Sequence, residues 1–211
     1  MDKSTQIDTF SRFTQVSRET ITSLKRYENK LISANRKFNL IGNSTVKQIW
    51  TRHFLDSAQV IDFIDKKNKS LIDIGSGAGF PGLVLAIIAK DRKISLKVKL
   101  IEKSPKKVKF LEKIINELNL NAEAINKNIF DYSKKLSEDV FVARAFKPLG
   151  VILELIHSKA ENWKKIFIFL GKTGINDLLQ ASKIWDIEYK QRVSITSNDS
   201  NVIEINRIRK K

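Results

Sequence analysis

Three glycines at alternate positions, Gly75, Gly77 and Gly79, are the residues of this sequence whose spacing most clearly suggests chemistry. They follow a short apolar run that begins at Leu71, and they precede a longer apolar segment over 83–88. This order predicts a buried strand, a tight turn and a helix. Glycine lets the backbone turn sharply and approach a ligand, and the helix directs partial positive charge at the turn. The stretch therefore predicts a cofactor-binding loop.

Two classes of cofactor-binding loop agree with this pattern. The segment 77–82 has the glycine spacing of the dinucleotide fingerprint, and the acidic Glu102 follows about 20 residues later. The expected strand, however, ends at Gly75 and carries Asp73, two residues too early for that register. Counted from the strand, the pattern is Asp73-x-Gly75-x-Gly77-x-Gly79. It looks like the first motif of S-adenosylmethionine (SAM) methyltransferases with a Rossmann-like fold. We favour SAM, and an ordinary glycine-rich turn is the alternative without a ligand.

The two acids have different expected roles. Asp73 would serve the ammonium group of the methionine moiety of SAM. Glu102 ends the next expected strand, where its carboxylate can accept hydrogen bonds from both ribose hydroxyls of an adenosine. A solvated charge at a strand end is the alternative for Glu102.

The composition favours a globular protein with a polyanionic partner. The chain has 211 residues, with 39 Lys or Arg against 23 Asp or Glu, so its net charge is +16. Such an excess favours nucleic acid, because basic side chains neutralise phosphates, although a lysine-rich solubilising surface is the alternative. The absence of cysteine excludes disulfides, thiolate metal sites and cysteine nucleophiles. With no apolar signal segment and no membrane-length apolar run, we expect a cytoplasmic protein of one domain.

The elements that position these residues follow a regular order. Apolar residues three to four apart predict helices over 4–38, with Ser17 as a cap, and again from Ser44. A helical cap, residues 1–66, thus precedes a core, residues 67–211, whose alternating strands and helices predict a mostly parallel sheet. The expected strands are 71–75, 96–102, 122–125, 139–145, 165–170, 185–195 and 202–208, the last two joined by a turn over 196–201. The expected core helices begin at Pro81, at Pro105 behind the cap Ser104, and at Leu149, the last running to Trp163.

Ligands of such sheets bind at the carboxyl ends of the strands, so Gly75, Glu102 and the turns after Ile125 and Ala145 should share one crevice. Basic residues should border this crevice and contact RNA phosphates while SAM lies beneath; a solvated helix face is the alternative. They are Lys103, Lys106, Lys107 and Lys109 beside Glu102, and Arg36, Lys37, Lys47 and Arg52 on the helical cap.

Three further segments bracket the glycine loop: Asn35–Leu40, Arg52–Ser57 and Ala143–Leu149. With these segments in this order, the chain resembles the RsmG family, also called GidB, along nearly its whole length. Members of that family are bacterial enzymes that methylate N7 of a guanine in 16S ribosomal RNA. The resemblance implies an α/β, Rossmann-like SAM-dependent methyltransferase with a mostly parallel seven-stranded sheet and an N-terminal helical cap. It also implies 16S rRNA or the assembling small ribosomal subunit as partner, and we expect a monomer.

The resemblance also assigns roles to single residues. Gly75 and Phe80 match positions that contact SAM, with Phe80 standing where leucine is frequent. Ile129 and Phe130 match a pair at the adenosine end, and Arg144 matches the cofactor-site arginine. Asp73, Gly77 and Glu102 are further cofactor candidates, and His53, Asp56, Lys106, Lys107 and Lys172 are candidates on the substrate side.

Two of these substrate-side assignments have alternatives. His53 and Asp56, three residues apart on one helical face, would equally form a pair that steadies the cap. Many family members have Leu-Lys-Gly after the fifth strand, whereas this chain has Leu170-Gly171-Lys172, so the role of that lysine does not transfer directly. A phosphate loop at Gly171 is excluded, because its motif requires a glycine five positions earlier, and neither Ile166 nor the next residue, Phe167, is glycine.

Methylation of guanine N7 needs no general base, because this nitrogen has a free lone pair. We therefore expect catalysis by positioning, with no catalytic acid–base residue and no metal site. Arg144 is expected on the cofactor side or near guanine O6, since a donor on N7 would block the attacking lone pair. The alternatives are an NAD(P)-dependent oxidoreductase, for which a Tyr-x-x-x-Lys pair is missing, and a non-catalytic RNA-binding protein.

Overall fold

In the computed structural model, which describes residues 1–211, the apolar run before the glycine loop forms β1 (Ser70–Ile74), an interior strand of a seven-stranded sheet. Its side chains alternate between the two faces, with Leu71 in one apolar cluster and Ile72 in the other. The strand is buried on both faces, which explains why its sequence is apolar without alternation. The other strands are β2 (Lys97–Glu102), β3 (Ala122–Asn126), β4 (Val140–Arg144), β5 (Lys165–Leu170), β6 (Trp185–Ser194) and β7 (Ser197–Lys210).

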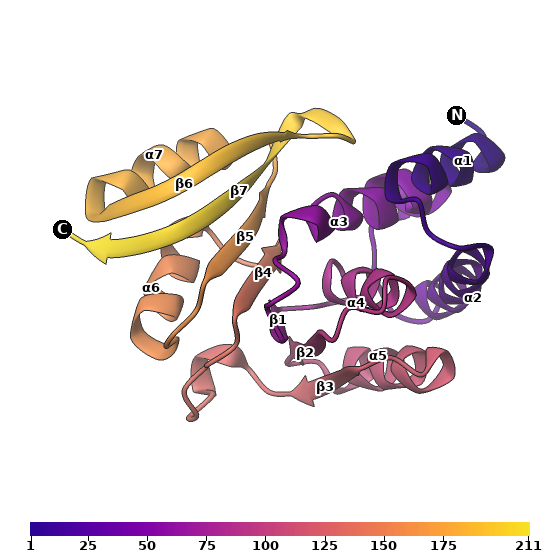
Figure 1. The fold of residues 1–211 in the computed structure, drawn as a ribbon, viewed down its shortest axis with the longest axis horizontal. Coiled ribbons are helices and arrows are strands. Elements are labelled where there is room, and N and C mark those ends of the chain that lie inside the picture. Colours follow the sequence, from indigo (N-terminus) through magenta and orange to yellow (C-terminus); the bar gives the residue numbers. More distant parts are fainter.

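The strand order is β3-β2-β1-β4-β5-β7-β6. Strands β1 to β5 pair in parallel, β7 runs antiparallel to β5, and β6 closes the edge as a hairpin with β7 (Figure 1). The direction of winding reverses between β1 and β4, which creates a crevice at their carboxyl ends. The expected mostly parallel seven-stranded sheet is confirmed.

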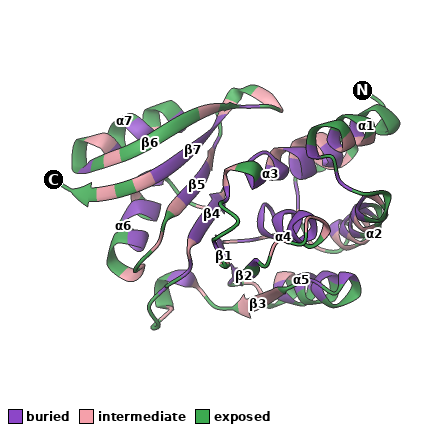
Figure 2. Cartoon of the chain, in the orientation of Figure 1, coloured by how far each residue is buried: buried purple, intermediate pink, exposed green.

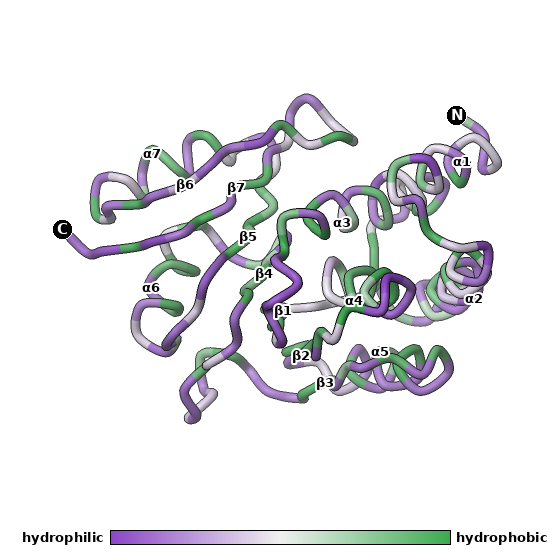
Figure 3. Tube along the Cα trace, in the orientation of Figure 1, coloured by the Kyte–Doolittle hydropathy of each residue, from purple (hydrophilic) through white to green (hydrophobic).

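Helices cover both faces of the sheet. One face packs against α4 (Gly82–Asp91) and α5 (Pro105–Leu118), the other against α6 (Leu149–Lys159) and α7 (Gly174–Ile184) (Figure 1). Helix α4 is buried from Gly82 to Ala89, and its continuous apolar character follows from that position between the sheet and the N-terminal helices (Figures 2 and 3).

The N-terminal cap is helical, as expected. It consists of α1 (Lys3–Thr14), α2 (Arg18–Asn35), the 3₁₀ turn η1 (Asn43–Gln48), the π-helical turn η2 (Trp50–Leu55), α3 (Asp56–Ala58) and the 3₁₀ turn η3 (Ile61–Phe63). Ser17 caps α2 by accepting a hydrogen bond from the backbone nitrogen of Thr20. Cap and core share one apolar cluster of 37 buried residues, in which the Tyr27 ring stacks 5.7 Å from that of Phe80.

Several expected boundaries were wrong. Helix α4 begins at Gly82, one residue after Pro81, and α6 ends at Lys159 rather than Trp163. The expected turn over 196–201 is mostly strand, because β7 begins at Ser197, and α7 was not expected. Ser104 precedes α5, but its hydroxyl does not cap the helix.

Candidate functional site

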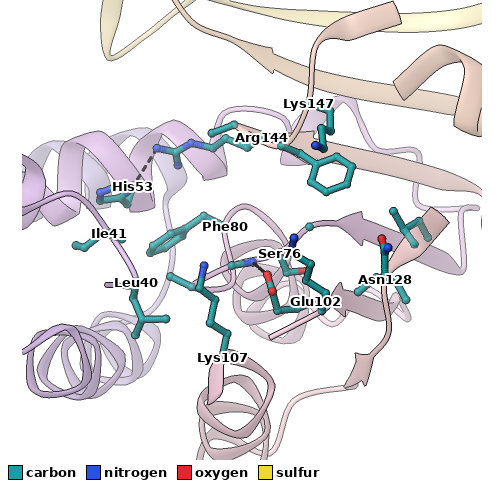
Figure 4. A pocket seen from close by; sticks show the side chains of 18 of the residues that line it. Leu40, Ile41, His53, Ser76, Phe80, Glu102, Lys107, Asn128, Arg144 and Lys147 are labelled. Carbon is teal, nitrogen blue, oxygen red and sulfur yellow. Dashed lines mark hydrogen bonds between the residues drawn. The ribbon is translucent and has the colours of Figure 1, made fainter. Parts of the chain in front are cut away.

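A cavity of about 480 Å³ opens at the carboxyl ends of β1, β2 and β4. Its walls are the glycine loop over 75–78, the end of β2 over 101–103, and the end of β4 over 144–147. The segment 40–42 of the cap and the segment 127–129 after β3 complete it (Figure 4). The strand-end crevice expected from the sequence is therefore present, and its volume lies within the roughly 300–1,000 Å³ of small-molecule sites.

The glycine loop has a backbone that only glycine adopts easily. Gly75, Gly77 and Gly79 have φ of 74°, 57° and 100°, in the left-handed region. A Cβ atom on Gly75 would lie 2.1 Å from the ring of Phe146. A valine at Gly75 would therefore displace the ring of Phe146 and strain the backbone of the loop.

Glu102 joins the end of β2 to the glycine loop. Its Oε2 accepts a hydrogen bond from the backbone nitrogen of Gly77 at 3.0 Å, and its Oε1 accepts one from that of Ser104 at 2.8 Å. The side chain lines the cavity (Figure 4). Because each carboxylate oxygen has a second lone pair, Glu102 can still accept hydrogen bonds from two hydroxyls of a ligand.

Asp73 lies beneath the loop instead of in the cavity wall. It is fully buried, and its Oδ2 accepts a hydrogen bond from the backbone nitrogen of Gly82 at 2.8 Å, at the start of α4. Its Oδ1 has no hydrogen-bond partner. Burial raises the pKa of this carboxyl to about 7, against the opposing effect of the Gly82 N–H. The structure thus gives Asp73 a role in fixing the loop to α4, and direct contact with a ligand ammonium is not supported by its position.

Arg144, the last residue of β4, reaches across the cavity wall to the cap. Its Nη2 donates to the carbonyl of Arg52 at 2.7 Å and lies 3.1 Å from Nδ1 of His53 (Figure 4). Its Nε lies 3.4 Å from Oδ2 of Asp56, and its Nη1 lies 3.4 Å from Oγ of Ser57. Three hydrogen-bond contacts and one ion pair to the cap therefore fix the guanidinium, and Nη1, which has two N–H groups, has only Ser57 as a partner.

His53 is buried beside Arg144, and its ring stacks 4.9 Å from that of Phe80. Arginine can only donate, so Nδ1 of His53 must accept, and the proton lies on Nε2, which donates to Oγ1 of Thr45 at 2.8 Å. Burial, and then the positive charges of Arg144 and Arg52, lower the pKa of His53 to about 3. The ring is therefore neutral, with both nitrogens engaged.

Asp56 connects this group to the β6–β7 hairpin. Besides facing Arg144, its Oδ1 accepts hydrogen bonds from Ser194 at 2.9 Å and Thr196 at 3.0 Å, and from the Gln59 amide at 2.8 Å. Asp56 does not line the cavity, and the expected steadying pair with His53 is absent, because both residues contact Arg144 instead.

The structure divides the remaining expected site residues between the cavity and its surroundings. Phe80 and Ile129 line the cavity, whereas Phe130 lies outside the lining with its ring stacked 6.0 Å from Phe146. Lys107 lines the cavity but Lys106 does not. Lys172 is exposed and lies 3.5 Å from Asp199, away from the cavity.

Sequence reasoning missed several cavity residues. Phe146 and Lys147 directly follow the end of β4, so the rule that ligands bind at strand ends could have identified them. Asn128 caps the 3₁₀ turn η4 (Ile129–Asp131) by accepting from the backbone nitrogen of Phe130. The segment 40–42 carries no chemical signal in its residue types, and only the packing of the cap brings it to the cavity.

Comparison with known proteins decides the family of this chain. The model of the GidB family, described as rRNA small subunit methyltransferase G, matches residues 20–206. The chain belongs to the GidB family. A "Ribosomal RNA small subunit methyltransferase G" of Pelagibacter ubique (strain HTCC1062) is 40% identical over 198 residues, covering 93% of this chain and 92% of the relative. The protein of the same name from Bartonella tribocorum (strain CIP 105476 / IBS 506) is 34% identical, covering 92% and 91%.

Solved structures support the fold of this GidB chain. M. jannaschii TYW2 in complex with AdoMet has a TM-score of 0.56 and 18% identity, covering 79% of this chain and 80% of that chain. M. capricolum TrmK in complex with S-adenosyl-homocysteine has a TM-score of 0.54 and 19% identity, covering 71% and 66%. The core thus has the fold of SAM-dependent methyltransferases. Together with membership of a methyltransferase family, this gives SAM as the cofactor.

The cavity of the GidB chain fits SAM. Gly75, Ser76 and Gly77 line the cavity, so a ligand there can reach the backbone of the glycine loop. Glu102 presents acceptors to the cavity, and Ile101 and Ile129 offer apolar walls for an adenine. Two further findings concern other classes of site: no helix is long and apolar enough to cross a membrane, and no group of three or more His, Cys, Asp or Glu side chains could hold a metal ion.

Proposed function

We propose that this chain transfers the methyl group of SAM to N7 of a guanine in 16S rRNA, in the cavity between the glycine loop and Arg144. Membership of the GidB family makes it a SAM-dependent methyltransferase of ribosomal RNA. The assignment of guanine N7 as the methylated atom goes beyond family membership, and it rests on the side chains that face the cavity.

The observation that carries this choice is that neither His53 nor Glu102, the imidazole and the carboxylate that line the cavity, is free to act as a general base on the target. Both ring nitrogens of His53 are engaged, and its pKa is too low for it to take up a proton at neutral pH. Glu102 is held by two backbone N–H groups, and its remaining lone pairs accept from the ribose hydroxyls of SAM. A target atom that first has to lose a proton would need such a base. Guanine N7 has a free lone pair and no proton, so it suits a cavity of this kind.

When bound, SAM supplies a methyl group on a positively charged sulfur. The chain's own residues then have to hold and orient the reactants. Glu102 accepts from the ribose hydroxyls, Ile101 and Ile129 pack on the adenine, and the backbone at Gly75 and Gly77 contacts the remainder. These are the cofactor contacts that we assign.

Arg144 orients the guanine. The second N–H group of its Nη1, which has no protein partner, can donate to O6, beside N7, and leaves the N7 lone pair free. Lys107 and Lys147 also line the cavity and provide positive charge for phosphates of the target nucleotide. Because A-form helices bury N7 in a deep, narrow groove, the target guanine lies in a loop or is flipped out of its stack.

Three further parts of the proposal concern the whole protein. Cap (1–66) and core (67–211) act as one domain, since they share an apolar cluster and Arg144 bonds to the cap. The chain acts as a monomer, because one chain supplies all the residues assigned above. It works in the cytoplasm, on rRNA or on the assembling small subunit.

Calorimetry and methyl-transfer assays test the proposal. We expect SAM binding, no NADH binding, and transfer of a labelled methyl group to small-subunit rRNA, recovered after digestion as N7-methylguanosine. Glu102→Gln should weaken SAM binding, whereas Glu112→Gln, an exposed glutamate of α5, should not. NADH binding without SAM binding would favour an oxidoreductase, and SAM binding without transfer to RNA would favour a non-catalytic RNA-binding protein.

A further inference from the structure

A second hollow, of about 640 Å³, lies between α2 and α5, outside the cavity described above. We call it the α2–α5 groove. Its walls carry six basic side chains and one acid, with the apolar Phe38 and Phe110 among them. The basic residues are Arg26, Lys30 and Lys37 of the cap, and Lys106, Lys109 and Lys113 of α5; the acid is Glu117.

Most of these charges have no partner. Lys30 pairs with Glu117 at 2.9 Å, but the other five basic side chains form no ion pair within the protein. Elsewhere on the surface, lysines such as Lys97 and Lys135 face carboxylates at 3.1 Å. Gathering five unpaired cations in one groove destabilises the folded chain by repulsion, unless an anion lies among them.

The spacing of the charges suits an extended anion. Lys106, Lys109 and Lys113 lie at helical positions i, i+3 and i+7, so they share one face of α5. From Lys106 to Glu117 the helix rises about 16 Å. One strand of a duplex places a phosphate about every 3.4 Å along its axis, so this length corresponds to roughly four to five phosphates. A single small anion would occupy only a fraction of this length.

The groove continues to the mouth of the cavity along both of its walls. On α5, Lys106 faces the groove while its neighbour Lys107 lines the cavity. On the cap side, Lys37 and Phe38 line the groove, and Leu40 and Ile41 line the cavity. Figure 4 shows Lys107 and Leu40 among the residues that line the cavity.

We propose that the α2–α5 groove binds the phosphate backbone of the rRNA segment that flanks the target guanine. This inference rests on the proposed function and extends it, because it separates the contacts that hold the RNA from those that hold the reacting groups. It also gives two neighbouring lysines different roles: Lys106 contacts flanking phosphates, and Lys107 contacts the target nucleotide.

A triple variant with Lys106, Lys109 and Lys113 each replaced by Gln tests the groove. The matched control replaces Lys66, Lys67 and Lys69 by Gln, which removes the same charge from exposed lysines before β1, at the opposite end of that strand from the cavity. Affinity for a small-subunit rRNA fragment is measured between 50 and 300 mM salt. We expect the log–log slope of the groove variant to fall by roughly two to three units and that of the control to change much less. SAM affinity should equal that of the wild type in both.

Transfer of a labelled methyl group to the same fragment separates the possible failures. If the wild-type protein transfers no methyl group to rRNA, the proposed function fails. If the wild type transfers it and the two triple variants have the same salt slope, the groove inference alone is overturned. A groove variant that fails to bind SAM would indicate a folding defect; single Lys109→Gln and Lys113→Gln variants then carry the test, each with an expected loss of about 0.7 to 0.9 units of slope.

Discussion

Nη2 of Arg144 lies 3.1 Å from Nδ1 of His53, so an arginine at the end of a core strand is held by a histidine of the N-terminal cap. The same nitrogen donates to the carbonyl of Arg52, and Nε faces Asp56. The cap is therefore part of the methyl-transfer cavity, because it determines where the one arginine of that cavity points.

Arg144→Lys should reduce kcat/KM for methyl transfer about ten- to hundred-fold. Lysine retains the positive charge, but it lacks the planar guanidinium that contacts His53, Arg52 and Asp56 together. Its side chain therefore loses the fixed orientation of Arg144. Steady-state kinetics with rRNA measure the change, and Arg209→Lys, an exposed arginine of β7, is the matched control. Wild-type kcat/KM in the Arg144 variant would show that the guanidinium network does not position the reactants.

His53 should make the folded protein less stable in acid. Its pKa is about 3 when folded and near 6.5 when unfolded, so only the unfolded chain takes up this proton between these values. The stabilisation is complete above pH 6.5 and is lost as the pH falls towards 3. Relative to His53→Asn, which retains an acceptor for Arg144, the wild type should lose about 1.6 kcal/mol between pH 6.5 and 5. Urea unfolding measures this, with His157→Asn as the control. An unchanged difference between the two proteins at both pH values would contradict a buried, neutral His53.

Asp73 should have the opposite effect. Its pKa is about 7 when folded and near 3.8 when unfolded, so the folded state holds a proton that the unfolded state releases. Stability from this group is complete below pH 3.8 and is lost as the pH rises through 7. The free energy of unfolding of Asp73→Asn should therefore rise relative to wild type by about 2 kcal/mol between pH 5 and 7. Because His53 and Asp73 act with opposite signs between pH 3.8 and 6.5, the wild type alone would conceal both effects; a parallel pH profile for Asp73→Asn and wild type would rule out the raised pKa.

Gly75→Ala should weaken SAM binding at least ten-fold and destabilise the protein by about 1 to 2 kcal/mol. The added Cβ meets the Phe146 ring, and the left-handed φ is strained for alanine. Gly171→Ala is the control, because a Cβ there meets nothing within 4 Å. Combining Gly75→Ala with Phe146→Ala should recover the steric part of the stability loss and leave the backbone strain. Equal unfolding free energies for Gly75→Ala and wild type would contradict the loop geometry.

Much of the fold could be predicted because its signals are local. The apolar run of β1, the glycines and the alternation of strands and helices all depend on neighbouring residues, and they led directly to the cavity and to Glu102. The position of Asp73 could not be predicted, because a carboxylate at a strand end can face either the ligand or the next helix. Only the distance from Oδ2 to the Gly82 nitrogen decides between these.

Long-range contacts account for what was missed or wrong. The contacts of Asp56 with Ser194 and Thr196 join residues 138 and 140 positions apart. Lys106 faces the groove and Lys107 faces the cavity because of how α5 is rotated about its axis relative to the cap. No local sequence pattern specifies that rotation. Helix α7 was overlooked because its face is weakly apolar, with Leu178 and Ala181 buried but Ile175 and Leu179 exposed.

The most direct test of the account is the position of the methyl group on the RNA. Small-subunit rRNA is incubated with the purified protein and SAM, and each N7-methylguanosine is mapped by chemical scission of the chain. We predict one new N7-methylguanosine, absent when the protein is omitted and strongly reduced with Arg144→Lys. A methyl group on a ribose oxygen, on an exocyclic amine or on another base would contradict the account, as would the absence of any methylated nucleotide.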